Sequence, residues 1–332
     1  SKQEGVAVTG FIVRRLIQSG GVILMMTVVV FLGVYAIGNP VDILLPDDAT
    51  AAERDLAIRS LGLDKPLFVQ YITFLTNLLR GDLGTSFVYN ISSIDLILLR
   101  LPATLELALC ALFIAIVIGL PLGLLCGLRP ESHLDRAVMG ASIVGFSIPN
   151  FWQGLMLIML FAVVLGWLPS TGRGEVGVIF GIETSLATWD GISHLILPAI
   201  NLSLYKLSLM IRLTRSGVRE VMYLDYVRFA RAKGLSERRI VMVHIMKVVL
   251  VPIITVVGME FGSLIAFATV TETIFAWPGM GKLIIDSIMR LDRPVIAGYL
   301  VVIVLLFVLI NLLVDLAYSV LDPRIRLGGG AE

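Results

Sequence analysis

Three carboxylates, Glu106, Glu260 and Asp315, lie inside long apolar stretches of the sequence. An ionised carboxylate at the centre of a membrane costs about 2.5 kcal/mol or more, so such residues usually face a helix-bundle interior or a water-filled path. Glu260 is therefore a candidate to line a solute path, and Glu106 is a second candidate. For Glu106 and Asp315 the alternative is a structural pair with a basic or hydroxyl neighbour, or a position near the membrane surface.

No nucleotide or metal site is expected from the motifs. Gly279-Met280-Gly281-Lys282 has the glycines and lysine of a phosphate-binding loop, but that motif needs a glycine five residues before its second glycine and Ser or Thr after the lysine. Ala276 and Leu283 stand at those positions. Cys110 and Cys126 are separated by about 24 Å of helical rise, too far for a disulfide. With three histidines in the whole chain, a thiolate–imidazole metal site is not expected either.

The composition indicates which class of protein must position these residues. Of the 332 residues 57% are hydrophobic and 15% are charged, and the mean hydropathy is +0.94. A water-soluble core cannot hide so many apolar side chains, so a soluble enzyme, a secreted scaffold and a disordered chain are excluded. The 26 Lys and Arg residues are balanced by 25 acids, and no basic field for nucleic acid results.

Six apolar stretches are long enough to cross the hydrocarbon layer as helices, which takes about 20 residues. They lack the alternating polar residues of barrel strands, so the predicted fold class is an all-α integral membrane protein with six transmembrane helices. The fourth stretch is the weakest, because Asn201 and Lys206 interrupt it. The predicted crossings are 16–38, 103–128, 138–165, 195–214, 248–271 and 295–321.

The distribution of Lys and Arg predicts the orientation, because cytoplasmic loops carry an excess of them. One side of the membrane holds 17 of these residues and the other holds nine. The richer side has both termini, 1–15 and 322–332, and the segment 215–247, so both termini are expected in the cytoplasm. The extracytoplasmic segments are then 39–102, 166–194 and 272–294.

The outer segment 39–102 is too long for a structureless link. A helix is predicted to start near Asp48, and a second helix is predicted from Pro66 to Leu79.

The cytoplasmic segment before the fifth crossing has the pattern of two short helices joined by a glycine. Leu224, Val227 and Ala230 recur at helical spacing, and Gly234 is expected to end this helix because glycine readily adopts left-handed dihedrals. Ser236 then starts a second helix. Such an elbow lies against anionic lipid headgroups, or it is a rigid docking surface for a cytoplasmic partner. The pattern alone leaves both interpretations open.

The stretch around Gly234 resembles the signature of the permease subunits of binding-protein-dependent ABC importers, in particular the dipeptide, oligopeptide and nickel class. The resemblance covers nearly the whole chain, and the long outer segment is similar to that of the first of the two homologous permeases. The stretches that carry it are 225–235 (DYVRFARAKGL), 61–67 (LGLDKPL), 81–86 (GDLGTS), 102–107 (PATLEL), 271–275 (TETIF), 277–281 (WPGMG) and 322–326 (DPRIR).

The resemblance implies a type I ABC importer permease fold and a fixed division of labour. This chain and a homologous second permease would form the pore in a bacterial inner membrane. Two ATPase subunits would bind ATP and Mg, and an extracytoplasmic substrate-binding protein would deliver short peptides or a related solute. The chain itself would be no enzyme, would bind no cofactor and no nucleic acid, and would contact membrane lipid. Its coupling helix would dock on an ATPase through Asp225, Arg228, Ala230, Arg231, Ala232, Gly234 and Leu235.

The chain also departs from the family pattern. The importer signature begins Glu-Ala-Ala where this sequence has Arg228-Phe229-Ala230. The fifth crossing often reads Gly-Leu-Gln where this chain has Gly258-Met259-Glu260, and Phe267 stands where a small residue is common. If Glu260 and Phe267 face the pore, they would alter which solute passes.

The remaining candidates lie near the third and fifth crossings. Asn150 and Trp152 follow Pro149, which must free a backbone carbonyl and bend the helix; a role in helix packing is the alternative to a role in the path. Glu272 completes the candidate path residues. Trp277-Pro278-Gly279 is placed at the outer mouth as an interfacial anchor, with a gate as the alternative.

A secondary transporter driven by an ion gradient is the competing function. Such folds show inverted repeats and charged relays at the midplane, whereas this sequence has no convincing repeat and its intramembrane acids are scattered. The solute itself is not specified, because the binding protein largely selects it. Dipeptides, oligopeptides, glutathione-like peptides, opines and nickel chelates all stay open.

Overall fold

The computed structural model describes residues 17–33, 41, 45–46 and 48–321, with side chains up to 314. The predicted termini 1–15 and 322–332, and the side chain of Asp315, therefore lie outside the described residues. The chain divides into two compact units. One comprises Ser1–Leu101, Lys282–Leu312 and Arg324–Glu332, and the other comprises Pro102–Gly281 and Leu313–Pro323.

Within the described residues, four helices are long and apolar enough to cross a membrane, and a bent pair raises the number to five. The first predicted crossing is described only over Ile17–Gly33, an apolar helix that is shorter than the others. A helical, multi-pass membrane protein is therefore confirmed, whereas the count of six crossings stays a prediction. The long helices are α5 (Ser93–Leu128), α8 (Trp189–Val221), the continuous stretch Glu237–Ile274 and α13 (Arg293–Leu321).

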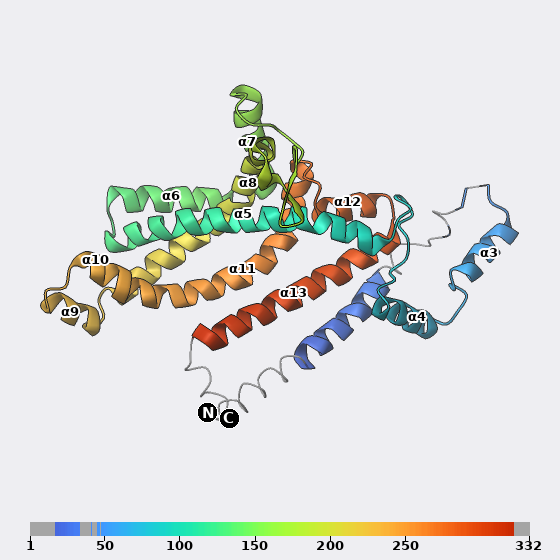
Figure 1. The fold of residues 1–332 in the computed structure, drawn as a ribbon, viewed down its shortest axis with the longest axis horizontal. Helices are drawn as coiled ribbons and strands as arrows, with labels where there is room; N and C mark the ends of the chain where they lie inside the picture. Colours follow the sequence, from blue (N-terminus) through green and yellow to red (C-terminus); the bar gives the residue numbers. More distant parts are fainter. Residues whose placement is uncertain (1–16, 34–40, 42–44, 47, 322–332) are drawn as a thin grey trace. The chain divides into compact units, whose positions relative to one another are not determined.

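In the second unit, α5 packs closely against α8 (Figure 1). Glycines recur on α5 every four residues, and a Cβ on any of them would lie within 2.6–2.7 Å of a side chain of α8. Small residues at this spacing let two membrane helices approach to backbone contact. The facing pairs are Gly119 with Met210, Gly123 with Thr214, and Gly127 with Val218.

The predicted third crossing, 138–165, is not one continuous helix. It consists of α6 (His133–Ser147), α7 (Asn150–Leu157) and the π-helical η1 (Ile158–Val164), with a bend of 107° between α6 and α7–η1. Pro149 lies at the N-cap position of α7, at the bend that its effect on the backbone predicts. Gln153 Nε2 donates to the carbonyls of Gly145 at 2.5 Å and Ile148 at 3.1 Å, and so satisfies backbone groups that the break exposes.

A β-hairpin and the elbow complete this unit. The antiparallel strands β1 (Gly177–Ile179) and β2 (Ile182–Thr184) lead into the 3-10 turn η2 (Ser185–Ala187) before α8. After α8 the chain forms α9 (Asp225–Ala232), α10 (Glu237–Arg239), the π-helical η3 (Ile240–Ile245) and α11 (Met246–Ile274).

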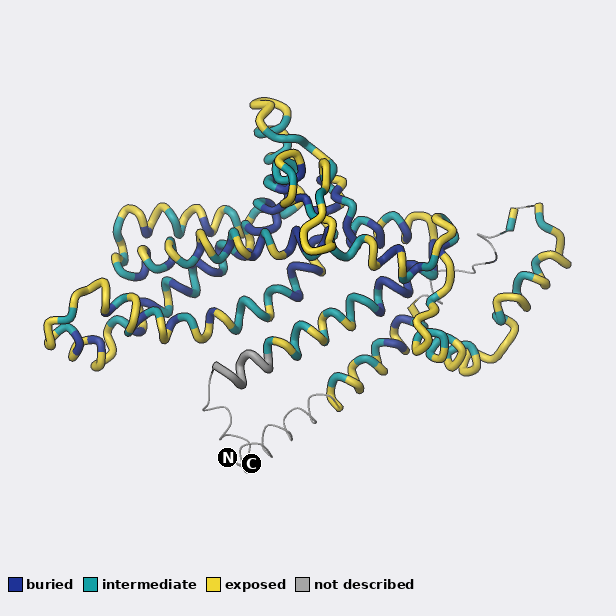
Figure 2. Tube along the Cα trace, in the orientation of Figure 1, coloured by how far each residue is buried: buried dark blue, intermediate teal, exposed yellow. Residues whose placement is uncertain are grey.

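In the first unit, the two predicted outer helices are present as α3 (Ala51–Ser60) and α4 (Leu67–Leu79). Thr50 and Glu53 form a capping box, and the hydrogen bonds from Thr50 lower the pKa of the Glu53 carboxyl. Neither helix has a fully buried residue (Figure 2). One face of α4 packs on the Ile17–Gly33 helix and α13, where Phe74 and Leu78 contact the cluster of Val30, Ala297 and Val301.

The loop before α13 is held by a buried acid of the same unit. Asp292 accepts hydrogen bonds from the Ser86 hydroxyl and from the Phe87 amide, the latter at 3.1 Å. It follows the short helix α12 (Met280–Met289).

Candidate functional site

The elbow begins with α9, whose C-terminus is a Schellman motif. Gly234 has φ +76°, its amide donates to the Arg231 carbonyl at 2.9 Å, and the Leu235 amide donates to the Ala230 carbonyl at 3.3 Å. This pair of bonds satisfies carbonyls that a helix end otherwise leaves unpaired. The glycine predicted from sequence to end the helix therefore does so. Arg231 also pairs with Glu237 at 2.9 Å, which ties α9 to α10 across the joint.

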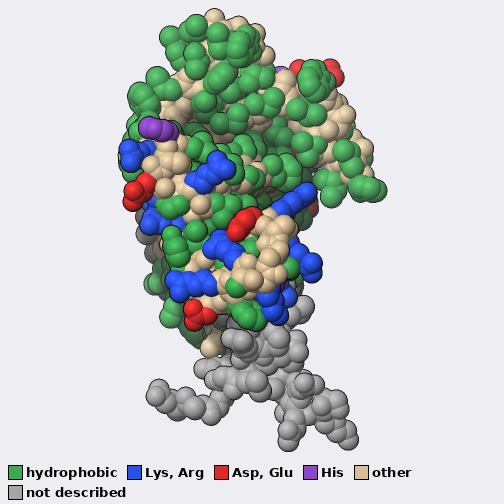
Figure 3. Space-filling view, turned by 90° about the vertical axis from the view of Figure 1, so that its left-hand side faces the viewer, with side chains coloured by type: hydrophobic (Ala, Val, Ile, Leu, Met, Phe, Trp, Pro, Cys, Tyr) green, Lys and Arg blue, Asp and Glu red, His purple; other side chains and the backbone are tan. Residues whose placement is uncertain are grey.

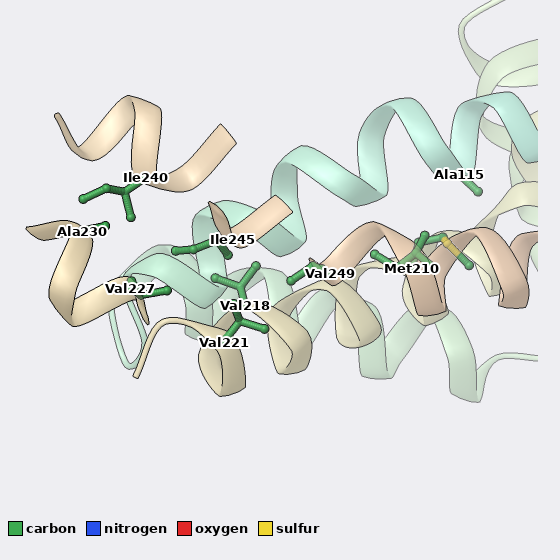
Figure 4. Close-up of a cluster of buried hydrophobic side chains, with 10 residues drawn as sticks. Ala115, Met210, Val218, Val221, Val227, Ala230, Ile240, Ile245 and Val249 are labelled. Atoms are coloured by element: carbon green, nitrogen blue, oxygen red, sulfur yellow. The ribbon is translucent and has the colours of Figure 1, made fainter. Parts of the chain in front are cut away.

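The underside of α9 is anchored in the core of the second unit. Val227 and Ala230 are buried, and they join a cluster with Val218, Ile240 and Ile245 from α8 and η3. In Figure 4, Ala230 and Ile240 point toward one another, and Val227 points toward Ile245 and Val218. The elbow is thus rigidly attached to the long helices α8 and α11.

The outer face of α9 is exposed, basic and partly aromatic. Figure 3 views the end that carries α9 and α10, where Lys and Arg side chains gather. Phe229 is 60% exposed, with the Lys233 ammonium 4.5 Å from its ring centre. Asp225 and Arg228 are exposed and lie 3.7 Å apart. Partial burial of Tyr226 raises the pKa of its phenol.

The predicted coupling residues therefore lie in three environments. Ala230 faces the core, Arg231 and Leu235 are half-buried, and the others are open to a partner: Asp225, Arg228, Ala232 and Gly234.

Between α8 and α11, Glu260 has a cationic partner. Lys206 Nζ contacts Glu260 Oε2 directly and donates to Ser263 Oγ at 2.7 Å. Ser263 Oγ lies 2.8 Å from the same carboxylate oxygen. The Lys206 side chain is 5% exposed and that of Glu260 is 23% exposed. The cation of this pair is thus buried, whereas its carboxylate partner is partly exposed to solvent.

Aromatic rings surround this ion pair. Lys206 Nζ lies 5.0 Å from the ring centre of Tyr205 and 6.0 Å from that of Phe267. Tyr205 stacks on Phe146 of α6 at 4.8 Å, and the Arg212 guanidinium lies 4.9 Å from the Phe146 ring. Phe267 is largely exposed. Two predicted path residues, Glu260 and Phe267, therefore meet at one place.

Asn150 belongs to a different, buried amide cluster. The Asn201 side-chain nitrogen donates to Asn150 Oδ1 at 2.6 Å and lies 3.1 Å from Thr271 Oγ1. These residues connect α7, α8 and α11, which supports the packing alternative for Asn150. Trp152, two residues further along α7, is about half exposed.

Glu106 forms an ion pair with Arg173 next to the β1–β2 hairpin. Its Oε2 lies 2.6 Å from Arg173 Nη2, and its Oε1 accepts from the Thr184 hydroxyl at 2.8 Å and the Ser185 amide at 2.7 Å. Both oxygens are occupied and the side chain is buried. The structural alternative for Glu106 is therefore favoured over a role in a path.

Glu272 and Trp277 are buried, which corrects two expectations. Glu272 has no exposed surface and accepts from the Thr104 hydroxyl at 2.6 Å, so it does not line a path in this conformation. A Cβ on Gly279 would overlap its carboxylate. Trp277 is fully buried and donates from Nε1 to the Ala103 carbonyl at 2.9 Å. An interfacial anchor needs a ring at the membrane surface, so Trp277-Pro278-Gly279 is a packing element instead.

Sequence reasoning missed the partners of these acids. The sequence marks Lys206 and Asn201 only as interruptions of an apolar stretch, and it indicates no role for Arg173. A lone lysine within a predicted crossing is a usable signal, because it needs an acid nearby. No comparable signal marks Arg173, which comes from an irregular loop. Among the described residues, no group of three His, Cys, Asp or Glu side chains could hold a metal ion.

Two family models match the chain. "Binding-protein-dependent transport system inner membrane component" matches residues 119–327, and the corresponding N-terminal model matches residues 8–108.

The chain is also similar over most of its length to individual permease proteins. The sequence is 38% identical over 333 residues to the dipeptide transport system permease protein DppB of Escherichia coli K12, covering 95% of this chain and 98% of that protein. It is 41% identical to the di/tripeptide permease DppB of Pseudomonas aeruginosa, covering 87% and 90%. It is 39% identical to the oligopeptide permease AppB of Bacillus subtilis, covering 95% and 99%.

A solved structure shows the fold. A chain of the methionine ABC transporter MetNI, in an inward-facing conformation, superposes with a TM-score of 0.55 at 19% identity. The likeness covers 68% of this chain and 96% of that one.

Proposed function

Because the chain belongs to the family of binding-protein-dependent transport system inner membrane components, we propose that it forms half of an ATP-driven import path for short peptides. The chain is a permease subunit of an ABC importer and not the subunit that hydrolyses ATP. The likeness to di- and oligopeptide permeases over nearly their whole length is the observation that carries the peptide assignment. It favours an importer with partner subunits over a self-powered secondary transporter.

The partners follow from this assignment. A homologous second permease completes the pore, two ATPase subunits bind ATP and Mg on the cytoplasmic side, and an extracytoplasmic binding protein delivers the peptide. Both termini and the segment 215–247 lie in the cytoplasm of a bacterium, in agreement with the excess of Lys and Arg there.

The elbow is the coupling element of the proposed mechanism. Its exposed face offers Phe229 flanked by Arg228 and Lys233, which suits an acidic groove with an apolar floor on an ATPase subunit. Its buried face is fixed by Val227 and Ala230. A push on α9 is therefore passed to α8 and α11 as a rigid displacement, and ATP binding biases the inward-open and outward-open states through such contacts.

The coupling role is tested by changing the exposed aromatic residue. Phe229→Ala removes an exposed ring without a cavity in the core, so the chain should fold and insert normally. We expect the purified permease pair to retain fewer ATPase subunits, and peptide uptake to fall with that loss. Phe180→Ala, at the fully exposed tip of the hairpin, is the matched control and should leave ATPase retention unchanged. Equal retention by the Phe229 variant and the parent would contradict the proposal.

A further inference from the structure

We infer that Glu260, with Lys206 and Ser263 behind it, is a subsite for a primary ammonium group, the free amino terminus of a peptide in transit. This inference rests on the proposed function and adds the chemical group of the cargo that the path recognises. Glu260 contacts the cargo, whereas Lys206 and Ser263 are positioning residues.

The two oxygens of the Glu260 carboxylate are used differently. Lys206 Nζ and Ser263 Oγ both approach Oε2. Within the part of the chain that the structure describes, Oε1 has no hydrogen-bond partner, and the side chain is partly exposed. A carboxylate has room for about four hydrogen bonds and accepts only. The free oxygen therefore suits a donor that arrives from outside this chain, and an ammonium group is the strongest such donor.

The depth of the ion pair in the proposed membrane-spanning helices also favours contact with a solute. Lys206 and Glu260 lie in the middle of α8 and α11, two helices with spans apolar enough to cross the bilayer. Charged residues at such positions face a bundle interior or a water-filled cavity rather than lipid. The open side of Glu260 is thus a surface that solute and water reach.

Lys206 also makes release of the bound ammonium group easier. A lone carboxylate in a low-dielectric path would bind an ammonium group tightly or take up a proton. Conduction requires a site that binds well enough for entry and weakly enough for exit. The Lys206 ammonium on Oε2 lowers the attraction of the Glu260 carboxylate for a second cation. The pair therefore has the properties of a transient site.

The aromatic rings fit the same ligand. Aromatic faces attract cations, and the exposed rings of Tyr205 and Phe267 border the ion pair. An ammonium group bound at Oε1 would lie in this setting of one carboxylate and two rings. An anionic or purely apolar solute group would gain nothing from it.

The test uses the complete complex, with its second permease, ATPase subunits and binding protein, in proteoliposomes. The probes are labelled trialanine and N-acetyl-trialanine, which differ in the terminal ammonium group. Glu260→Gln keeps the side-chain volume and removes the charge. We expect trialanine uptake to fall about tenfold, the factor for loss of one hydrogen bond between charged groups, with uptake of the acetylated probe unchanged. Because both complexes use the same binding protein, its own preference cancels in the comparison.

Exchanging the two charged residues distinguishes recognition of the cargo by Glu260 from a purely structural role of the ion pair. Lys206→Glu with Glu260→Lys restores an ion pair between α8 and α11 but places the cation on the open side. We expect the swap to assemble and to remain as defective for trialanine as Glu260→Gln. Asp286→Asn, which breaks a surface ion pair with Lys282 at 2.7 Å, is the matched control and should transport normally.

Each other outcome overturns the inference. Rescue of trialanine uptake by the swap would show a purely structural pair, and loss of ATPase subunits or of the second permease from Glu260→Gln would show an assembly contact. Equal loss for both probes, or no loss, would exclude ammonium recognition. If the parent complex fails to accumulate trialanine with ATP, the proposed function fails instead, and the two failures are thereby distinguished.

Discussion

Two buried ion pairs of the second unit differ in how completely their carboxylates are used. Glu106 directs both oxygens at donors of its own chain, the Arg173 guanidinium, the Thr184 hydroxyl and the Ser185 amide. Glu260 gives one oxygen to Lys206 and Ser263 and leaves the other open. A saturated carboxylate fixes structure, whereas a half-used one at an accessible place remains able to bind a ligand. Burial alone does not separate these two roles.

Replacing Glu106 by glutamine gives the largest expected effect. A glutamine has one acceptor oxygen and a donor NH₂ group, so at this position the NH₂ must face another donor whichever way it is turned. Arg173 is also left as a buried charge without its counter-ion. We expect Glu106→Gln to lower the stability of the second unit by about 3 kcal/mol. The measurement is the thermal unfolding midpoint of the purified complex in detergent.

Arg173→Lys should have an intermediate effect. The guanidinium reaches Glu106 and the Glu183 carbonyl together, the latter at 3.1 Å. One guanidinium nitrogen, Nη2, makes both contacts. A lysine keeps the charge, but its side chain is shorter and does not carry a nitrogen as far from the backbone as Nη2. We expect a loss of about 1 kcal/mol for the missing hydrogen bond, seen in the same unfolding midpoint. A midpoint equal to that of the parent would show that the longer guanidinium side chain is not needed.

Glu260→Gln should cost less stability than Glu106→Gln. Its amide oxygen can accept from Lys206 and Ser263 while the NH₂ group turns to the open side. We expect a loss of about 1 kcal/mol or less, since one charged partner becomes neutral, together with the transport defect described above. If both glutamine variants lower the midpoint equally, the distinction between a saturated and an open carboxylate is wrong.

The smallest expected effect belongs to Phe267→Ala. The ring is 62% exposed, so its removal leaves little cavity and the unfolding midpoint should not change. Loss of one cation–π contact of about 0.5–1 kcal/mol predicts a two- to fivefold decrease in trialanine uptake. Phe267→Tyr keeps an aromatic face and should transport as the parent does. A decrease of the same size for N-acetyl-trialanine would assign Phe267 to general packing.

Local features of the fold were predictable from the sequence, and long-range pairings were not. Gly234 was expected to end a helix because a left-handed C-terminal residue is a local property, and its φ of +76° confirms this. Pro149 was expected to bend the third crossing for a similar reason. The partners of Glu106 and Glu260 lie 67 and 54 residues away, and only the packing of helices and hairpin brings them together.

For Trp277, a local sequence pattern predicted the wrong environment. Tryptophan near the end of a crossing is typical of the membrane interface, but here the indole N–H finds the Ala103 carbonyl inside the bundle. The hydropathy pattern gives the depth of a residue along a helix. It does not give the side of the helix on which a buried hydrogen bond is available.

We expect this chain to form a path that partner ATPases drive. The most direct measurement is accumulation of labelled trialanine in proteoliposomes that contain either the complete complex or this chain alone. We predict accumulation by the complete complex with ATP and binding protein, and none by the lone chain under a proton or sodium gradient. Uphill accumulation by the lone chain would show instead that it is a transporter that needs no ATPase partner.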